Sequence, residues 1–238
     1  MNPSFAPVAI VAGTALSYVV ALPLGVPALV PILNTLPAFP FMIASLRRGQ
    51  VGEAIVRMLV WAAALAVCAT AFSYGRTADA GAMFIHGERY RQEMFTYLLT
   101  GAGPEGSLRL FLPEHAWHAG AFCALALVTG SLAAMPMGAV LMNYMAYYVG
   151  TLAVASAHPL TTIALAWVPW AVIRIASFVV LGVVLSGPVL GRIFGFAYRL
   201  RDHRRWIGAA AAGLCLDVVL KWAFAHPWRD MIRAAAGW

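Results

Sequence analysis

The chain has 238 residues, of which 62% are hydrophobic and only 11% charged, with a formal net charge of +7. A soluble domain carries roughly 25% charged residues, so this composition excludes an ordinary water-facing surface and indicates an integral membrane protein. The basic residues gather in short runs at the ends of apolar segments, which favours a lipid bilayer over nucleic acid as the partner.

Apolar runs close to the length of about 20 residues that crosses a bilayer recur along the whole chain. They cover residues 8–24, 26–46, 54–74, 117–135, 138–157, 160 to about 186, and 207–224. The sequence therefore predicts an all-α integral membrane protein. Its single domain, residues 1–238, is a bundle of six or seven transmembrane helices.

The second run is irregular, with the polar pair Asn34 and Thr35 at its middle. Four prolines surround this pair: Pro27, Pro31, Pro37 and Pro40. Proline removes a backbone donor and bends a helix, so the run is a broken helix, a re-entrant hairpin or a strongly bent span. Discontinuous helices build solute sites in transporters, but a bent span without a ligand fits the same pattern.

A polar stretch, residues 75–115, separates the third and fourth runs. Within it, Tyr90, Met94, Tyr97 and Leu98 recur at helical spacing, which predicts an amphipathic helix over residues 85–99 that lies on the membrane surface or caps the bundle. Residues 108–112 are predicted to form a short extended piece, and residues 188–200 an interfacial helix.

Arginines in the short loops set the expected orientation. The basic residues near span ends are Arg47, Arg48, Arg57, Arg192, Arg199, Arg201, Arg204 and Arg205. Placing these residues in the cytoplasm makes the 75–115 loop extracytoplasmic, and we expect the protein in a bacterial inner membrane.

Most histidines fall on the expected extracytoplasmic side. His115 and His118 share a helix face, with Glu114 beside them. Histidines from several helices at one level can build a metal site in a bundle, so a transition metal or haem is the candidate cofactor. The candidate ligands are Glu114, His115, His118, His86, His158 and His226. The alternative is that these histidines face lipid headgroups or water.

Charged residues also fall inside two predicted spans. Arg174 lies near the middle of the sixth run, and Asp217 and Lys221 lie in the seventh. Charges at such depth are costly unless they are paired or hydrated. We expect Arg174 and Asp217 to pair across the two helices, with Asp217 and Lys221, four residues apart, as the competing pair. Such a pair either fixes helix packing or lines a path for a solute, an ion or a proton.

The fifth run carries a polar-aromatic face made of Asn143, Tyr144, Tyr147, Tyr148 and Thr151. Three of these residues, Asn143, Tyr147 and Thr151, follow a four-residue step and form one stripe. Hydrogen bonds between helices are the favoured interpretation of this stripe. The sharper alternative is a pocket for a quinone, a pigment or a small solute.

Two functional hypotheses follow. The first is a small-solute or ion transport protein, or a subunit of a larger membrane complex, with its path along Arg174, Asp217, Lys221, Asn143 and Tyr147. The second is a metal- or haem-binding redox protein or enzyme with its site at the extracytoplasmic surface. The sequence carries no nucleotide-binding, hydrolase or haem-attachment motif, and it leaves open whether the protein is an enzyme.

Overall fold

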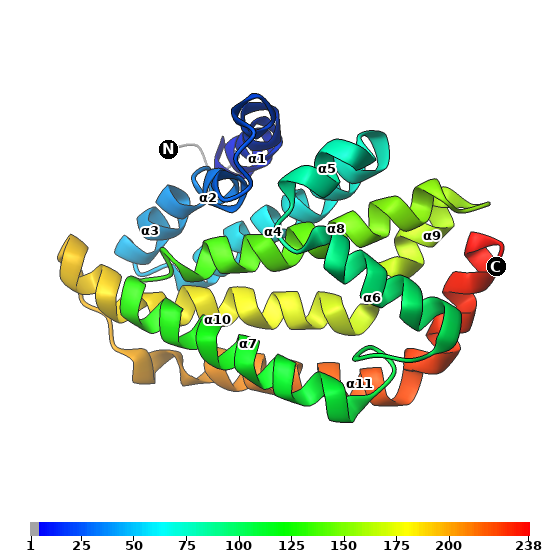
Figure 1. The fold of residues 1–238 in the computed structure, drawn as a ribbon. Coiled ribbons are helices and arrows are strands. Elements are labelled where there is room, and N and C mark those ends of the chain that lie inside the picture. Colours follow the sequence, from blue (N-terminus) through cyan, green and yellow to red (C-terminus); the bar gives the residue numbers. More distant parts are fainter. Residues whose placement is uncertain (1–4) are drawn as a thin grey trace.

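The computed structural model describes residues 5–238, and this part of the chain folds into helices without strands (Figure 1). The helices are α1 (Phe5–Leu24), α2 (Leu29–Thr35), α3 (Phe39–Arg47), α4 (Val51–Gly75), α5 (Thr77–Met83), α6 (Gly87–Thr100), α7 (Leu108–Thr129), α8 (Ala134–Val154), α9 (Pro159–Ala166), α10 (Pro169–Phe194), η1 (Leu200–His203) and α11 (Arg204–Ala236). The prediction of an all-helical fold is confirmed.

Helix α10 lies in the middle of the bundle and packs against α11, α7 and α4, while α4 packs in turn against α8 and α1 (Figure 1). The bundle has two distinct ends. The end of α3 and the α10–α11 connection, with their arginines, form what we call the arginine end, at the left of Figure 1. Helices α5, α6 and α9 and the C-terminus form the loop end, at the right.

Six helical segments are long and apolar enough to cross a membrane. They are Phe5–Leu24, Leu29–Arg47, Val51–Gly75, Ala134–Val154, Pro169–Phe194 and Leu200–Ala236. This set is compatible with a multi-pass membrane protein. Helix α7 has 22 residues, and its first half is more polar because it carries Arg109, Glu114, His115 and His118.

Three predicted boundaries are wrong. The expected span 117–135 is divided, because Gly130 and Ser131 have positive φ angles of 60° and 67°, which end α7 before α8 begins. Residues 108–112 are the first turns of α7 and are not extended. No separate interfacial helix begins at Pro188, which lies inside α10.

The proline-rich run is a span broken into α2 and α3. Asn34, at the end of α2, donates to Ser17 Oγ at 2.7 Å and accepts from Asn143 Nδ2 at 2.8 Å. Tyr18 donates to Asn143 Oδ1 at 2.7 Å, and Trp61 Nε1 donates to the Asn34 carbonyl at 2.8 Å. These contacts tie four helices together at the break, as the hydrogen-bonding interpretation of the α8 stripe predicts.

The predicted amphipathic helix is confirmed as α6, which buries Met94, Tyr97 and Leu98. Two hydrogen bonds attach it to α11. Tyr97 donates its hydroxyl to the Ala225 carbonyl at 2.6 Å, and Arg229 Nε donates to the Leu98 carbonyl at 2.9 Å. Helix α6 also packs on α8, so it caps the loop end of the bundle (Figure 1).

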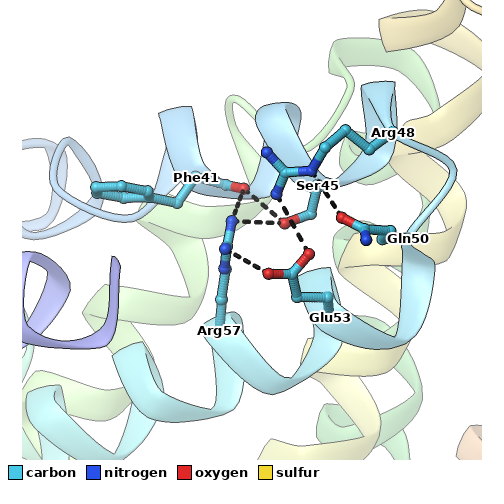
Figure 2. Close-up of polar contacts among 6 residues, drawn as sticks. All are labelled: Phe41, Ser45, Arg48, Gln50, Glu53 and Arg57. Atoms are coloured by element: carbon cyan, nitrogen blue, oxygen red, sulfur yellow. Dashed lines mark hydrogen bonds and ion pairs between the residues drawn. The ribbon is translucent and has the colours of Figure 1, made fainter. Parts of the chain in front are cut away.

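At the arginine end, a buried guanidinium joins α3 to α4 (Figure 2). Arg57 is 5% exposed and donates to Ser45 Oγ at 2.8 Å and to the Phe41 carbonyl at 3.4 Å. It also pairs with Glu53, which accepts a second contact from Arg48 at 3.2 Å. The charge of Arg57 is thereby neutralised where it is buried, and the tight turn between the two helices is held in place.

Candidate functional site

A cavity of about 430 Å³ lies inside the bundle, between α7, α8 and α10 and beneath α6. Its volume is in the range of small-ligand sites. Towards the loop end its wall is polar, with residues such as His86, Arg89, Glu93, Glu105, Glu114 and His118. Towards the arginine end its wall is apolar, with residues such as Met42, Met58, Trp61, Met135, Phe178 and Val183. The cavity is therefore amphipathic along its length.

A cluster of paired charges lies between these two regions, with Arg174 and Glu105 on the cavity wall and their partners buried behind it. Arg174 donates from Nε and Nη2 to the two carboxylate oxygens of Asp217, at 2.8 and 2.9 Å, and Asp217 is fully buried. The predicted Arg174–Asp217 pair is thus confirmed. Lys221 instead pairs with Glu105, with Nζ 2.9 Å from Oε1. His115 Nδ1 lies 3.7 Å from Asp217 Oδ2.

Phe111 packs between the two cations of this cluster. Its ring centroid is 3.4 Å from Lys221 Nζ and 4.9 Å from the central carbon of the Arg174 guanidinium. The His115 ring stacks on it at a centroid distance of 5.0 Å. An aromatic face stabilises a desolvated cation, so Phe111 helps to keep both charges away from bulk water.

Among the hydrogen-bond donors of the cavity wall that have no partner within residues 5–238, three carry the argument below. They are Nη1 of Arg174 and the hydroxyls of Tyr90 and Tyr144, and all three remain accessible from the cavity. The two tyrosine rings lie 4.5 Å apart between centroids. Burial raises the pKa of Tyr90, on the capping helix, well above its ordinary value, so its hydroxyl stays protonated as a donor.

The predicted metal ligands do not form one site. They come from several segments: His86, Glu114, His115, His118, His158 and His226. Four of them line the cavity, namely His86, Glu114, His115 and His118. The other two, His158 and His226, are exposed elsewhere on the bundle. Across residues 5–238, no group of three or more His, Cys, Asp and Glu side chains could hold a metal ion. The geometry of the described residues therefore does not support a metal ion held by three or more of these side chains.

The predicted path residues separate into two groups. Arg174 lines the cavity, and Asp217 and Lys221 lie buried directly behind its wall. Asn143 belongs to the network at the α2–α3 break, and Tyr147 donates to Glu88 at 3.2 Å. Neither side chain lines the cavity.

Sequence reasoning missed Tyr90 and Glu105 as site residues, and it named Tyr144 only as a member of the polar-aromatic face of the fifth run. Tyr144 lies beside the four-residue stripe of α8 and not on it, about 100° around the helix from Asn143. For Glu105 the signal was only partial, because a lysine at the depth of Lys221 needs a carboxylate, but the 75–115 loop carries several and nothing local selects one of them.

No protein-family description, curated protein or solved structure matched this chain.

Proposed function

We propose that this protein is a multi-pass protein of a bacterial inner membrane that binds a small solute in its cavity and moves it across the membrane, alone or as a subunit of a larger complex. One observation carries the proposal. The cavity joins a polar region at the loop end to an apolar interior, and Arg174 of α10, paired with Asp217 of α11 behind it, lies on the wall between the two regions.

A salt bridge that only fixed helix packing would need no space beside it. Arg174 keeps 23% of its side chain accessible and faces the cavity, although Asp217 behind it is fully buried. Ionised groups inside a membrane usually face a partner or a hydrated cavity, and Arg174 does both. This arrangement supports a polar path for a solute better than a purely structural ion pair.

The interior of the cavity reaches towards the arginine end. Met42 of α3 and Met58 of α4 line it there, next to Gly182 and Val183 of α10. Both α3 and α4 pack against α10. A solute that crosses the membrane must pass this contact, so we place the gate where α3 and α4 meet α10.

Access to the cavity can be tested by labelling single cysteines. The three native cysteines, Cys68, Cys123 and Cys215, are first replaced by serine. We expect Gly138→Cys, on the cavity wall, to react with a membrane-impermeant thiol reagent added from the loop side. Val219→Cys, on the exposed face of α11, is the lipid-facing control and should stay unlabelled. If Gly138→Cys is unreactive from both sides while Ala102→Cys in the exposed loop reacts, the proposal fails.

Movement of solute can be tested in proteoliposomes with organic anions, organic cations, amino acids and sugars. Gly138→Leu places bulk in the cavity, because a Cβ there would meet Phe122 at an ordinary contact of 3.6 Å. We expect this variant to lose the flux that the native protein supports. Gly208→Leu, which adds the same bulk where nothing lies within 4 Å, should retain it. Equal flux in both variants would show that the solute does not pass through the cavity.

A further inference from the structure

Three groups on the cavity wall can donate hydrogen bonds and have no partner among the described residues. Arg174 offers Nη1, and Tyr90 and Tyr144 offer their hydroxyls. A guanidinium fork with two of its sides occupied by Asp217 still presents two N–H bonds on Nη1. Three donors that line the same cavity, one of them cationic, are the chemistry that recognises an acidic headgroup.

The carboxylates around the cavity mouth limit the negative charge of a ligand that can bind beside Arg174. Glu105 is paired with Lys221, and Glu93 is paired with Arg89 at 2.9 Å. Glu114 is exposed at the mouth and has no ion pair among the described residues. Its charge disfavours a ligand with two or more negative charges, so a single negative charge fits best.

Beyond Arg174 the cavity is apolar along one stripe of α10. Phe178, Val179, Gly182 and Val183 follow Arg174 on the cavity wall. The rise of an α-helix places Val183 about 13 Å further along the axis than Arg174. Gly182 keeps this part open, because a Cβ there would approach the Phe122 ring to 3.2 Å. This length and lining suit a hydrocarbon chain.

We propose that the solute is an amphipathic monoanion, with one acidic headgroup held by Arg174, Tyr90 and Tyr144 and an apolar chain extending towards Val183. The inference rests on the proposed solute-binding function of the same cavity. A free single-chain acid and an anionic membrane lipid share this chemistry.

The probe for this proposal is 11-(dansylamino)undecanoic acid, whose fluorescence rises in apolar surroundings. We expect saturable binding to the protein in phosphatidylcholine nanodiscs, above the signal of empty nanodiscs. Dodecanoate should displace the probe, whereas dodecanol and dodecyltrimethylammonium, with the same chain and a neutral or cationic head, should displace it at least tenfold less well. Equal displacement by all three compounds, or no saturable binding, would overturn the proposal.

Variants test the headgroup site and the chain site separately. Tyr144→Phe removes one hydroxyl without changing charge, and a lost hydrogen bond to an ionised group should weaken binding about tenfold. Tyr74→Phe, on an exposed tyrosine away from the cavity, is its matched control and should bind as the native protein does.

The double change Arg174→Gln/Asp217→Asn keeps the pair neutral and should also weaken binding at least tenfold. Gly138→Leu should weaken binding of the long-chain probe, and Gly208→Leu should not. Unchanged binding in Tyr144→Phe and in the double variant, with both folded, would refute the headgroup assignment.

The outcomes distinguish this inference from the proposed function. If Gly138→Cys is labelled and another solute class is transported but the acid does not bind, the ligand class is wrong and the function stands. If the acid binds with the expected variant effects but no flux occurs, the ligand class stands and transport fails. Nanodiscs that contain phosphatidylglycerol identify the source of the natural ligand. If this lipid displaces the probe, the ligand is a membrane lipid; if it does not, the ligand is a free acid.

Discussion

Asp217 accepts hydrogen bonds from Arg174 on both of its carboxylate oxygens, at 2.8 and 2.9 Å, across the interface between α10 and α11. Removal of one partner leaves the other charge buried, which costs about 3–5 kcal/mol in such pairs. We therefore expect Asp217→Leu to lower the stability of the purified protein strongly.

The double variant Arg174→Leu/Asp217→Leu should recover most of that stability, because no isolated charge remains. It should nevertheless not bind the acidic probe, since Nη1 is gone. Thermal unfolding in detergent, followed by fluorescence-detected size exclusion, measures the first effect and probe titration the second. A double variant as unstable as the single one would show that the pair does more than neutralise charge.

The hydrogen-bond network at the α2–α3 break gives a second prediction. Asn143→Ala leaves Asn34 Oδ1 and the Tyr18 hydroxyl without partners, and Asn143 is only 2% exposed. Each buried unsatisfied group costs about 1–3 kcal/mol, so we expect a clear fall in the unfolding temperature. Gln92→Ala, on the exposed face of α6, removes a polar side chain of similar chemistry and should change it little. Equal effects would argue against the network.

The guanidinium of Arg57 gives a third prediction (Figure 2). Arg57→Ala removes the link to Ser45 and to the Phe41 carbonyl and leaves Glu53 without its buried partner. We expect a loss of about 2–3 kcal/mol of unfolding free energy. Arg48→Ala, in which an exposed partner of Glu53 is lost, should cost less than about 1 kcal/mol. Chemical denaturation of the two variants compares them directly, and a larger effect for Arg48→Ala would contradict the assignment.

Acidification should loosen the capping helix. The pKa of Glu88 is lowered to about 2, mainly by its hydrogen bonds with Arg91, and Tyr147 of α8 also donates to it. An unfolded glutamate titrates near a pKa of about 4.3, so the depressed folded pKa adds stability above about pH 4, and this contribution is lost as the pH falls through about 2.

A fluorophore on exposed Thr96 of α6 can report this change between pH 5 and pH 2. Because Glu88 is largely exposed, we expect a small effect, and Glu88→Gln should flatten the pH dependence of the signal. If the acid-induced change is the same in Glu88→Gln, another group is responsible.

Features that depend on local pattern were predictable from the sequence. The apolar runs located the long helices, the spacing of Met94, Tyr97 and Leu98 located α6, and the cost of intramembrane charge identified the Arg174–Asp217 pair. Each of these follows from residues close in sequence or from a strong energetic demand.

Features that depend on tertiary contacts were not predictable. The partner of Lys221 is Glu105, which approaches from a loop more than 100 residues earlier, and no local spacing reports such a contact. The predicted topology places five histidines on the same side of the membrane, which suggested a metal site. A shared depth in the membrane does not bring side chains together, because they can still lie on different sides of the bundle. Their positions around the bundle depend on helix packing, which keeps His158 and His226 away from the cavity.

Helix α11 is long enough to relate the capping helix α6 to the thickness of the bilayer. Its 33 residues extend about 50 Å, whereas the hydrocarbon core is about 30 Å thick. An upright α11 with Arg204 at one membrane surface would place Arg229, 25 residues or about 38 Å further along, beyond the opposite surface together with the attachments of α6. A helix that is longer than the bilayer adjusts its tilt to the local thickness. Because α6 is attached to this end of α11, we expect a change in bilayer thickness to shift α6 relative to the cavity mouth.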